Sequence, residues 1–200
     1  MEPDGASVAD LAALGKLFEE YRARLLEMLR QRIDPRLRPR LDAEEILQEA
    51  FLAARGKWGR SGQEPPKSSY AWLYRIALDT LIEQWRRHTR DCRDPRREFA
   101  LPEQSSMQMG LDLLHAGTSP SEAFTRKEGS ERVRQALDRL RPADREILWM
   151  RHYDGLSFVE AAVVLDITAN AATVRYVRAI QRLRDLWQQT WGTPTAGGGD

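Results

Sequence analysis

The sequence predicts an all-α fold of two small helical bundles joined by a flexible linker. Apolar residues recur at three- and four-residue spacing along most of the 200 residues, which is the period of one helix face. No run of strand length alternates between apolar and polar residues with a period of two. The helical period weakens only between about residues 91 and 118, where two prolines and two glycines stand among polar residues, a composition typical of a linker.

Composition excludes several classes of protein. The formal net charge is +1, from 31 basic and 30 acidic residues, so the arrangement of the charges carries more information than their sum. The single cysteine, Cys92, excludes an internal disulfide and a zinc site built on paired cysteines. No apolar stretch approaches the roughly 18 residues of a membrane span, and the N-terminus lacks the pattern of a signal peptide. We therefore expect a cytoplasmic protein with no membrane span.

Three helices are expected in the first half of the chain. The first ends before Pro35, because proline removes a backbone donor and clashes with the preceding turn. The second begins at Asp42, which can cap the free amides while Glu45 reaches back, and it runs to about Trp58. The third spans about 70–87. The expected inward residues are Leu14, Phe18, Tyr21, Leu25, Met28 and Leu29 in the first helix, Ile46, Leu47, Ala50, Phe51 and Ala54 in the second, and Trp72, Leu73, Ile76, Ala77, Leu81 and Trp85 in the third.

Four further helices are expected in the second half. One opens at 119–122, where a serine cap precedes proline and glutamate, and another starts at Pro142. A second capping box, at 157–160, opens a short helix. It ends in a break at Asp166, where a left-handed backbone is expected and aspartate tolerates it. The last helix spans about 169–187, before a tail with nothing to bury.

A short helix, a tight break and a longer basic helix, in this order, indicate a helix-turn-helix. The last helix has no acidic residue between Asn170 and Arg184, and its apolar stripe lies opposite its basic side chains. Such a helix can lie in the major groove, with its first residues at base edges and its arginines on phosphates. The alternative is an ordinary surface helix whose arginines only contact water. The arginines are Arg175, Arg178, Arg182 and Arg184.

A second basic surface follows the third helix. The segment 85–97 holds six arginines against two aspartates, and the helix before it carries Trp72, Tyr74 and Trp85. Rings beside arginines suit single-stranded DNA, because unpaired bases stack on rings while guanidinium groups follow the backbone. The alternative, which we favour for Trp72 and Trp85, is a core position, because aromatic residues at helical spacing are usually buried.

The sequence contains no recognisable catalytic or metal site. Glu45 and Glu49 share a helix face, as carboxylates do in metal-bridged bundles, but no Glu-x-x-His pair accompanies them. His152 has no thiol or serine nucleophile in a recognisable motif beside it. We expect no catalytic residue, no metal, no cofactor and no enzymatic activity.

Four segments together resemble a known family. They are DAEEILQEAFLAARGKW, SYAWLYRIALDTLIEQWRR, ALDRLRPADREILWMRHYDGLSFVEAAVVLDIT and TVRYVRAIQRLR. In this order and spacing they are similar to the extracytoplasmic-function (ECF) sigma factors of bacterial RNA polymerase. The resemblance implies sigma domain two at 10–98, a linker at 99–119, sigma domain four at 120–188, and a disordered tail at 189–200.

The resemblance also implies three binding surfaces. The acidic helix 42–58 would bind the clamp of core RNA polymerase. The helix 70–87, with its basic extension, would read the minus-ten element of promoter DNA, and the last helix would read the minus-thirty-five element. The implied polymerase-binding residues are Asp42, Glu45, Gln48 and Glu49. The implied minus-ten residues are Trp72, Tyr74, Asp79, Arg86, Arg87 and Arg90, and the implied minus-thirty-five residues are Arg151, Thr173, Val174, Arg175, Val177 and Arg178.

Three residues depart from the pattern of the family. The resemblance implies that one base of the minus-ten element is flipped into a pocket. Asp79 stands in that region where asparagine is usual, and a carboxylate cannot donate a hydrogen bond as an amide can, so the base preference of the family does not carry over. Ala161 replaces an isoleucine, which shrinks a core contact. Val174 stands where a serine is common, so a polar contact is lost.

The implied function is that of a sigma factor, which binds core RNA polymerase and directs promoter-specific transcription initiation. Promoter DNA is its second partner, and an anti-sigma factor or another regulator is a further one. Two alternatives remain. A helix-turn-helix regulator acting without core polymerase would need an effector or dimerisation domain in the first half, which resembles sigma domain two instead. A sigma-like decoy that only binds an anti-sigma factor would not need the DNA-facing arginines.

Overall fold

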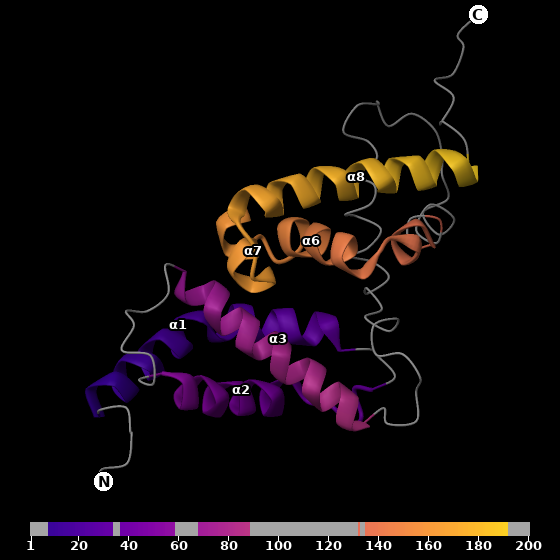
Figure 1. Cartoon of the computed structure of the whole chain (residues 1–200). Helices are drawn as coiled ribbons and strands as arrows, with labels where there is room; N and C mark the ends of the chain where they lie inside the picture. The colour runs from indigo at the N-terminus through magenta and orange to yellow at the C-terminus, as the bar shows by residue number, and fades with distance from the viewer. Residues whose placement is uncertain (1–7, 34–36, 59–67, 89–131, 133–134, 192–200) are drawn as a thin grey trace, which may run out of the picture. The chain divides into compact units, whose positions relative to one another are not determined.

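The structure, a computed structural model, describes residues 8–33, 37–58, 68–88, 132 and 135–191. Every regular element in this part of the chain is an α-helix, so the predicted all-α class is confirmed (Figure 1). The helices are α1 (Val8–Arg32), α2 (Ala43–Lys57), α3 (Ser69–His88), α6 (Pro142–His152), α7 (Phe158–Leu165) and α8 (Ala169–Trp191). The chain divides into two compact units, residues 1–100 with 159–167 and residues 101–158 with 168–200. The predicted linker 99–119, the helix start at 119–122 and Arg90 lie outside the described residues.

The helices α1, α2 and α3 pack on one another around an apolar core (Figure 1). Leu25 of α1 is 0% exposed, and Ile46 of α2 and Leu73 of α3 are at most 2% exposed. Phe18 of α1 meets Phe51 of α2 edge to face, with ring centroids 5.0 Å apart. Each leucine or isoleucine buried in this way contributes roughly 1.5–3 kcal/mol relative to an exposed one. These contacts confirm the inward positions that the helical period predicts for these residues.

The helix α2 begins where its capping residue predicts. Asp42 has extended backbone geometry, and its Oδ1 atom accepts a hydrogen bond from the amide of Glu44 at 2.7 Å. Glu44 and Glu45 place negative charge in the first turn, beside the positive end of the helix dipole. The cap fixes where α2 starts, and the helical period then fixes which side chains point outward.

A buried ion pair joins α6 to α8. The helix α6 begins at Pro142, as predicted. The carboxylate of Asp144, with a side chain only 2% exposed, accepts hydrogen bonds from Arg141 at 2.9 Å and from Arg182 of α8 at 2.6 Å. Burial raises the pKa of Asp144, but the two guanidinium groups outweigh this effect and hold the pKa below its ordinary value of 3.8. The Nη1 atom of Arg182 is therefore engaged inside the unit, while its side chain is 38% exposed, and its contact with a DNA phosphate stays a prediction.

The break between α7 and α8 has the geometry that the sequence predicts. Asp166 adopts a φ of +55°, in the left-handed region. The Oγ1 atom of Thr168 accepts a hydrogen bond from the amide of Ala171 at 3.1 Å, which caps the start of α8. The predicted order of short helix, break and long helix is thus confirmed.

The helix α8 is longer than predicted. It continues to Trp191, beyond the expected end at Trp187. The rings of these two tryptophans lie one turn apart, with centroids 5.1 Å from each other, and Arg139 donates a hydrogen bond to Thr190 at 2.8 Å. The last turn therefore has packing contacts, and the predicted start of the tail at residue 189 is wrong.

The buried ion pair generates a prediction about stability and pH. Because the folded pKa of Asp144 lies below its unfolded value, the pair stabilises the fold fully above about pH 5, and this stabilisation is lost as the pH falls through the folded pKa. We expect Asp144→Asn to lower the free energy of unfolding by about 1.5–3 kcal/mol at pH 7, the range for hydrogen bonds to charged groups. Urea unfolding from pH 7 to pH 3 should show the wild type losing more stability than Asp144→Asn. Asp185→Asn, at an exposed hydrogen bond to Gln181, is the control. Parallel pH profiles of wild type and Asp144→Asn would contradict the assignment.

The left-handed residue at the break gives a second prediction. Asp166→Gly should keep or slightly raise the thermal stability, because glycine adopts a positive φ without steric cost. Asp166→Val should destabilise the protein by about 1–2 kcal/mol, because a β-branched residue is strained in this region. Circular dichroism during thermal unfolding measures both. A valine variant as stable as the glycine variant would show that the backbone at the break is not constrained.

Candidate functional site

The predicted polymerase-binding residues lie on one exposed face at the start of α2. Asp42, Glu45, Gln48 and Glu49 are all exposed, whereas Ile46, Leu47 and Ala50 are buried on the opposite side. We call Asp42, Glu45, Gln48, Glu49 and Leu52 the α2 face. The structure thus brings the four predicted residues together on the surface of the first unit.

The acidic residues of α2 differ in their internal partners. Glu44 pairs with Arg22 at 2.5 Å and with Arg30 at 3.6 Å, so its charge is used within the unit. Glu49 accepts a hydrogen bond from Gln84 of α3 at 2.5 Å. In the part of the chain that the structure describes, the side chains of Glu45 and Gln48 have no hydrogen bond or ion pair. These two side chains are therefore the ones that can meet a partner without losing an internal contact.

Sequence reasoning missed Leu52 on this face. Its side chain is 59% exposed, and it lies one turn beyond Gln48 and two turns beyond Glu45. An exposed leucine among polar side chains supplies apolar area that a partner can bury. The available signal was the seven-residue spacing from Glu45, which places Leu52 on the outer side of α2 and not in its apolar stripe.

The predicted minus-ten residues on α3 divide into exposed and buried groups. Asp79, Arg86 and Arg87 are exposed, and Arg87 pairs with Glu83 one turn earlier at 2.5 Å. Trp72 is half-buried, with its ring centroid 5.5 Å from that of Trp58. The predicted core position of Trp72 is therefore only partly confirmed, because its side chain is half-buried.

Two aromatic residues of α3 belong to the core. Trp85 is 7% exposed, which confirms its expected core position. Tyr74 is 0% exposed, its hydroxyl accepts a hydrogen bond from Arg32 of α1, and its ring lies 6.0 Å from that of Tyr70. This burial contradicts the predicted DNA contact for Tyr74, because its ring has no face open to a base. The stripe that α3 buries is wider than the sequence analysis assumed.

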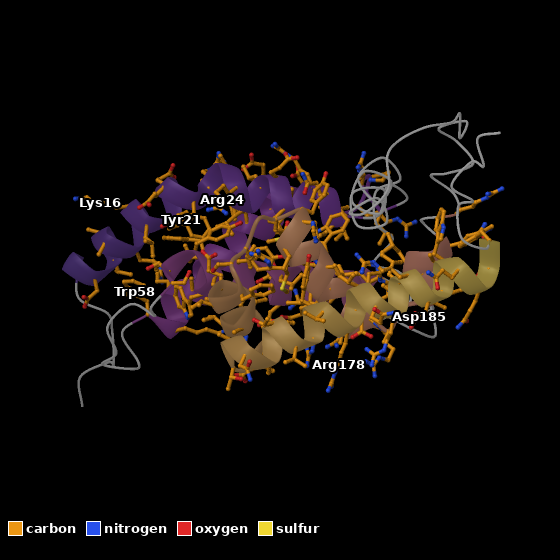
Figure 2. All side chains as sticks on the ribbon, turned by 90° about the horizontal axis from the view of Figure 1, so that it is seen from above. Lys16, Tyr21, Arg24, Trp58, Arg178 and Asp185 are labelled. Atoms are coloured by element: carbon orange, nitrogen blue, oxygen red, sulfur yellow. The ribbon has the colours of Figure 1, made fainter. Side chains whose placement is uncertain are left out.

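The predicted minus-thirty-five residues of α8 lie mostly on its open side. Val174 and Val177 are 39% and 59% exposed, and Arg178 is exposed and points outward from the helix (Figure 2). Arg175 is partly exposed. Thr173 is also partly exposed, and its hydroxyl donates to the carbonyl of Ala169 at 3.0 Å. Apolar and basic side chains therefore alternate along the first turns of α8.

Arg151 lies at the end of α6 and not on α8. Its guanidinium group lies over the ring of Phe158, 4.3 Å from the centroid, and it donates a hydrogen bond to the carbonyl oxygen of Leu156. These contacts fix the turn before α7, at Gly155, which has a positive φ of 67°. Arg151 therefore has a structural role that its motif position did not reveal.

The described ranges show neither a metal cluster nor a membrane-spanning helix. No group of three or more histidine, cysteine, aspartate or glutamate side chains there is arranged to hold a metal ion. None of the described helices has the length and apolar character that crossing a bilayer requires. The α2 face, the exposed residues Asp79, Arg86 and Arg87 of α3, and the open side of α8 carry the predicted site residues in the described part of the chain.

Comparisons with known proteins show two matching family regions. Family models of sigma-70 region 2 and sigma-70 region 4 match residues 17–91 and 130–183. The chain is 29% identical over 180 residues to the ECF RNA polymerase sigma factor SigD of Mycobacterium tuberculosis, which covers 90% of this chain and 79% of that protein. It is 29% identical over 142 residues to the RNA polymerase sigma-H factor of Pseudomonas aeruginosa, which covers 69% of each.

Two further similarities were found. The ECF RNA polymerase sigma factor SigW of Bacillus subtilis is 26% identical over 147 residues, covering 72% of this chain and 74% of that protein. The solved structure of CnrH in complex with the cytosolic domain of CnrY aligns with a TM-score of 0.49 and 23% identity over 90% of each chain. The region 2 and region 4 matches occur in this order and together cover well over half of the chain. The chain therefore belongs to the extracytoplasmic-function sigma factors, the subunits that direct bacterial RNA polymerase to promoters.

Proposed function

We propose that this sigma factor binds core RNA polymerase through the α2 face and reads promoter DNA with α3 and α8. Sigma domain two extends over 10–98 and sigma domain four over 120–191, with a linker at 99–119. The observation that carries the proposal is the availability of Glu45 and Gln48, which are exposed and have no partner among the described residues. Such side chains, on a helix whose other side is buried, can contact a partner without breaking an internal contact.

The chemistry of the α2 face fits a partner surface that is basic at its rim and apolar at its centre. Glu45 and Glu49 supply negative charge, and Leu52 supplies an apolar side chain that is 59% exposed. Charge complementarity gives such an interface its orientation, whereas burial of an anchor residue gives it affinity. The clamp of core polymerase is the partner that the family resemblance implies for this face.

For the minus-ten element we retain Asp79, Arg86 and Arg87 on α3, together with Trp72 and Arg90. The arginines are suited to phosphates, and the ring of Trp72 is only half-buried, so part of it can meet a base. Tyr74 is no longer part of the proposed surface. Because Asp79 is exposed and can only accept hydrogen bonds when ionised, it favours a base that presents a donor.

For the minus-thirty-five element, α8 offers an apolar and basic surface in place of a polar one. Val174 and Val177 can contact thymine methyl groups in the major groove. Arg178, Arg175 and Thr173 flank them, and Arg151 completes the set from α6. We further propose that the protein acts in the cytoplasm, has no enzymatic activity, and is regulated by an anti-sigma factor or another protein.

The α2 face generates the prediction that tests this function. Glu45→Lys should leave the fold intact, because exposed substitutions usually change stability by within about 0.5 kcal/mol. It should weaken assembly with core polymerase by about 10- to 100-fold, because like charges would meet across the contact. The matched control is Glu19→Lys, the same charge change at an exposed position of α1. Co-purification with core polymerase, with circular dichroism of each variant, measures the effect.

The outcomes of this test separate the competing functions. The assignment of the α2 face is wrong if two variants both assemble with core polymerase as well as the control does. These are the single variant Glu45→Lys and the double variant Glu45→Lys with Gln48→Lys. If the wild type binds duplex DNA tightly without any core polymerase, a regulator acting alone is favoured. If the wild type binds an anti-sigma factor but neither polymerase nor DNA, the decoy function is favoured.

Arg178 provides a second prediction for the same function. Because Arg178 is exposed on α8, we expect it to contact a phosphate of the minus-thirty-five element. Arg178→Ala should then weaken promoter binding by the polymerase holoenzyme evenly across promoter sequences and lower the salt slope by about one. Gln188→Ala, also exposed on α8, should change neither quantity. A shift in which minus-thirty-five sequence is preferred would make Arg178 a base-reading residue instead.

A further inference from the structure

The end of α6 carries an imidazole ring that α8 holds in place. His152 is exposed, and its ring stacks on that of Tyr176, with centroids 5.6 Å apart and an interplanar angle of 22°. The Nε2 atom of His152 lies 2.8 Å from the hydroxyl oxygen of Tyr176. Phe158 packs edge to face on the same tyrosine at 5.3 Å. Tyr176, a partly buried residue, thus orients a histidine that lies at the surface.

The surroundings of this pair are positively charged. Burial raises the pKa of Tyr176, whereas the charges of Arg151 and Arg184 lower it, so both guanidinium groups act at the hydroxyl that binds His152. Arg151 and His152 also occupy the last turn of α6, where the helix dipole favours positive charge. An exposed donor among positive charges suits an anion better than a neutral base edge.

The register of α8 places the pair beside the surface proposed to read DNA. Tyr176 lies between the buried stripe of Ala172 and Ala179 and the open positions Thr173 and Val177. His152, at the end of α6, therefore lies beside the first half of α8. In helix-turn-helix proteins the helix that reads bases lies in the groove, while the elements before it meet the DNA backbone.

We propose that His152 is a further DNA contact of this sigma factor, donating a hydrogen bond to a backbone phosphate of the promoter, with Tyr176 as its positioning residue. This inference rests on the proposed binding of the minus-thirty-five element by α8. It gives a role in DNA binding to an exposed histidine of α6 and to a partly buried tyrosine of α8. Because the contact is to a phosphate, it strengthens binding without selecting a sequence.

The test uses the holoenzyme of core polymerase with this chain, and a duplex promoter selected by that holoenzyme from a random library. His152→Ala should weaken binding about three- to tenfold, the range for loss of one partly screened hydrogen bond to a charged group. Tyr176→Phe, which keeps the ring and removes the hydroxyl, should weaken binding about twofold to threefold. In the His152→Ala background, Tyr176→Phe should have no further effect, because the two residues then act as one unit.

Replacement of His152 by lysine tests the phosphate contact directly, because a purely structural role of His152 would leave the salt dependence of binding unchanged. His152→Lys should restore affinity and raise the salt slope by about one relative to His152→Ala, because a lysine at this place neutralises a phosphate. Gln188→Ala is again the control. Wild-type affinity for His152→Ala, or effects of the two substitutions that simply multiply, would overturn the inference. If the wild-type holoenzyme selects no promoter at all, the proposed function is wrong, and the inference that rests on it is overturned with it.

Discussion

Each helix of this protein buries one stripe of side chains, and the width of that stripe decides which residues a partner can reach. In α2 the stripe is narrow, so Ile46 and Leu47 are buried while Glu45 and Gln48 remain outside. In α3 it is wide, and Tyr74 is withdrawn from the surface altogether. The surfaces available for recognition are therefore a by-product of how the core is filled.

The same constraint divides the charged residues into internal and external sets. Glu44 is held by arginines of α1, and Arg182 is held by the buried carboxylate of Asp144. Asp144 is buried, so breaking its pair with Arg182 would leave a buried charge without compensation. The pairs of Glu44 lie at the surface and are weaker. A formal net charge of +1 is compatible with an acidic surface on α2 and a basic surface on α8, because the exposed charges of each sign are gathered on different helices.

Sequence patterns predicted most of the fold because caps and helical periodicity are local. Asp42, Pro142 and Asp166 each mark a boundary through backbone chemistry that needs no knowledge of the neighbours in space. The errors concern contacts between elements. Neither the pairing of Arg182 with Asp144, 38 residues away, nor the hydrogen bond of Arg32 to Tyr74, 42 residues away, leaves a trace in spacing along one helix. The site residues could be placed on helices from the sequence, but their competition for internal partners could not.

The cap at Asp42 has a consequence for how this position can vary among relatives. Its carboxylate both accepts the amide of Glu44 and lies on the α2 face. Asparagine or serine would preserve the start of the helix while removing the charge, because both are good capping residues. Alanine would remove both at once. Helix capping therefore limits the residues that this position tolerates to a small group of side chains. Within that group, only binding of the partner selects for a negative charge.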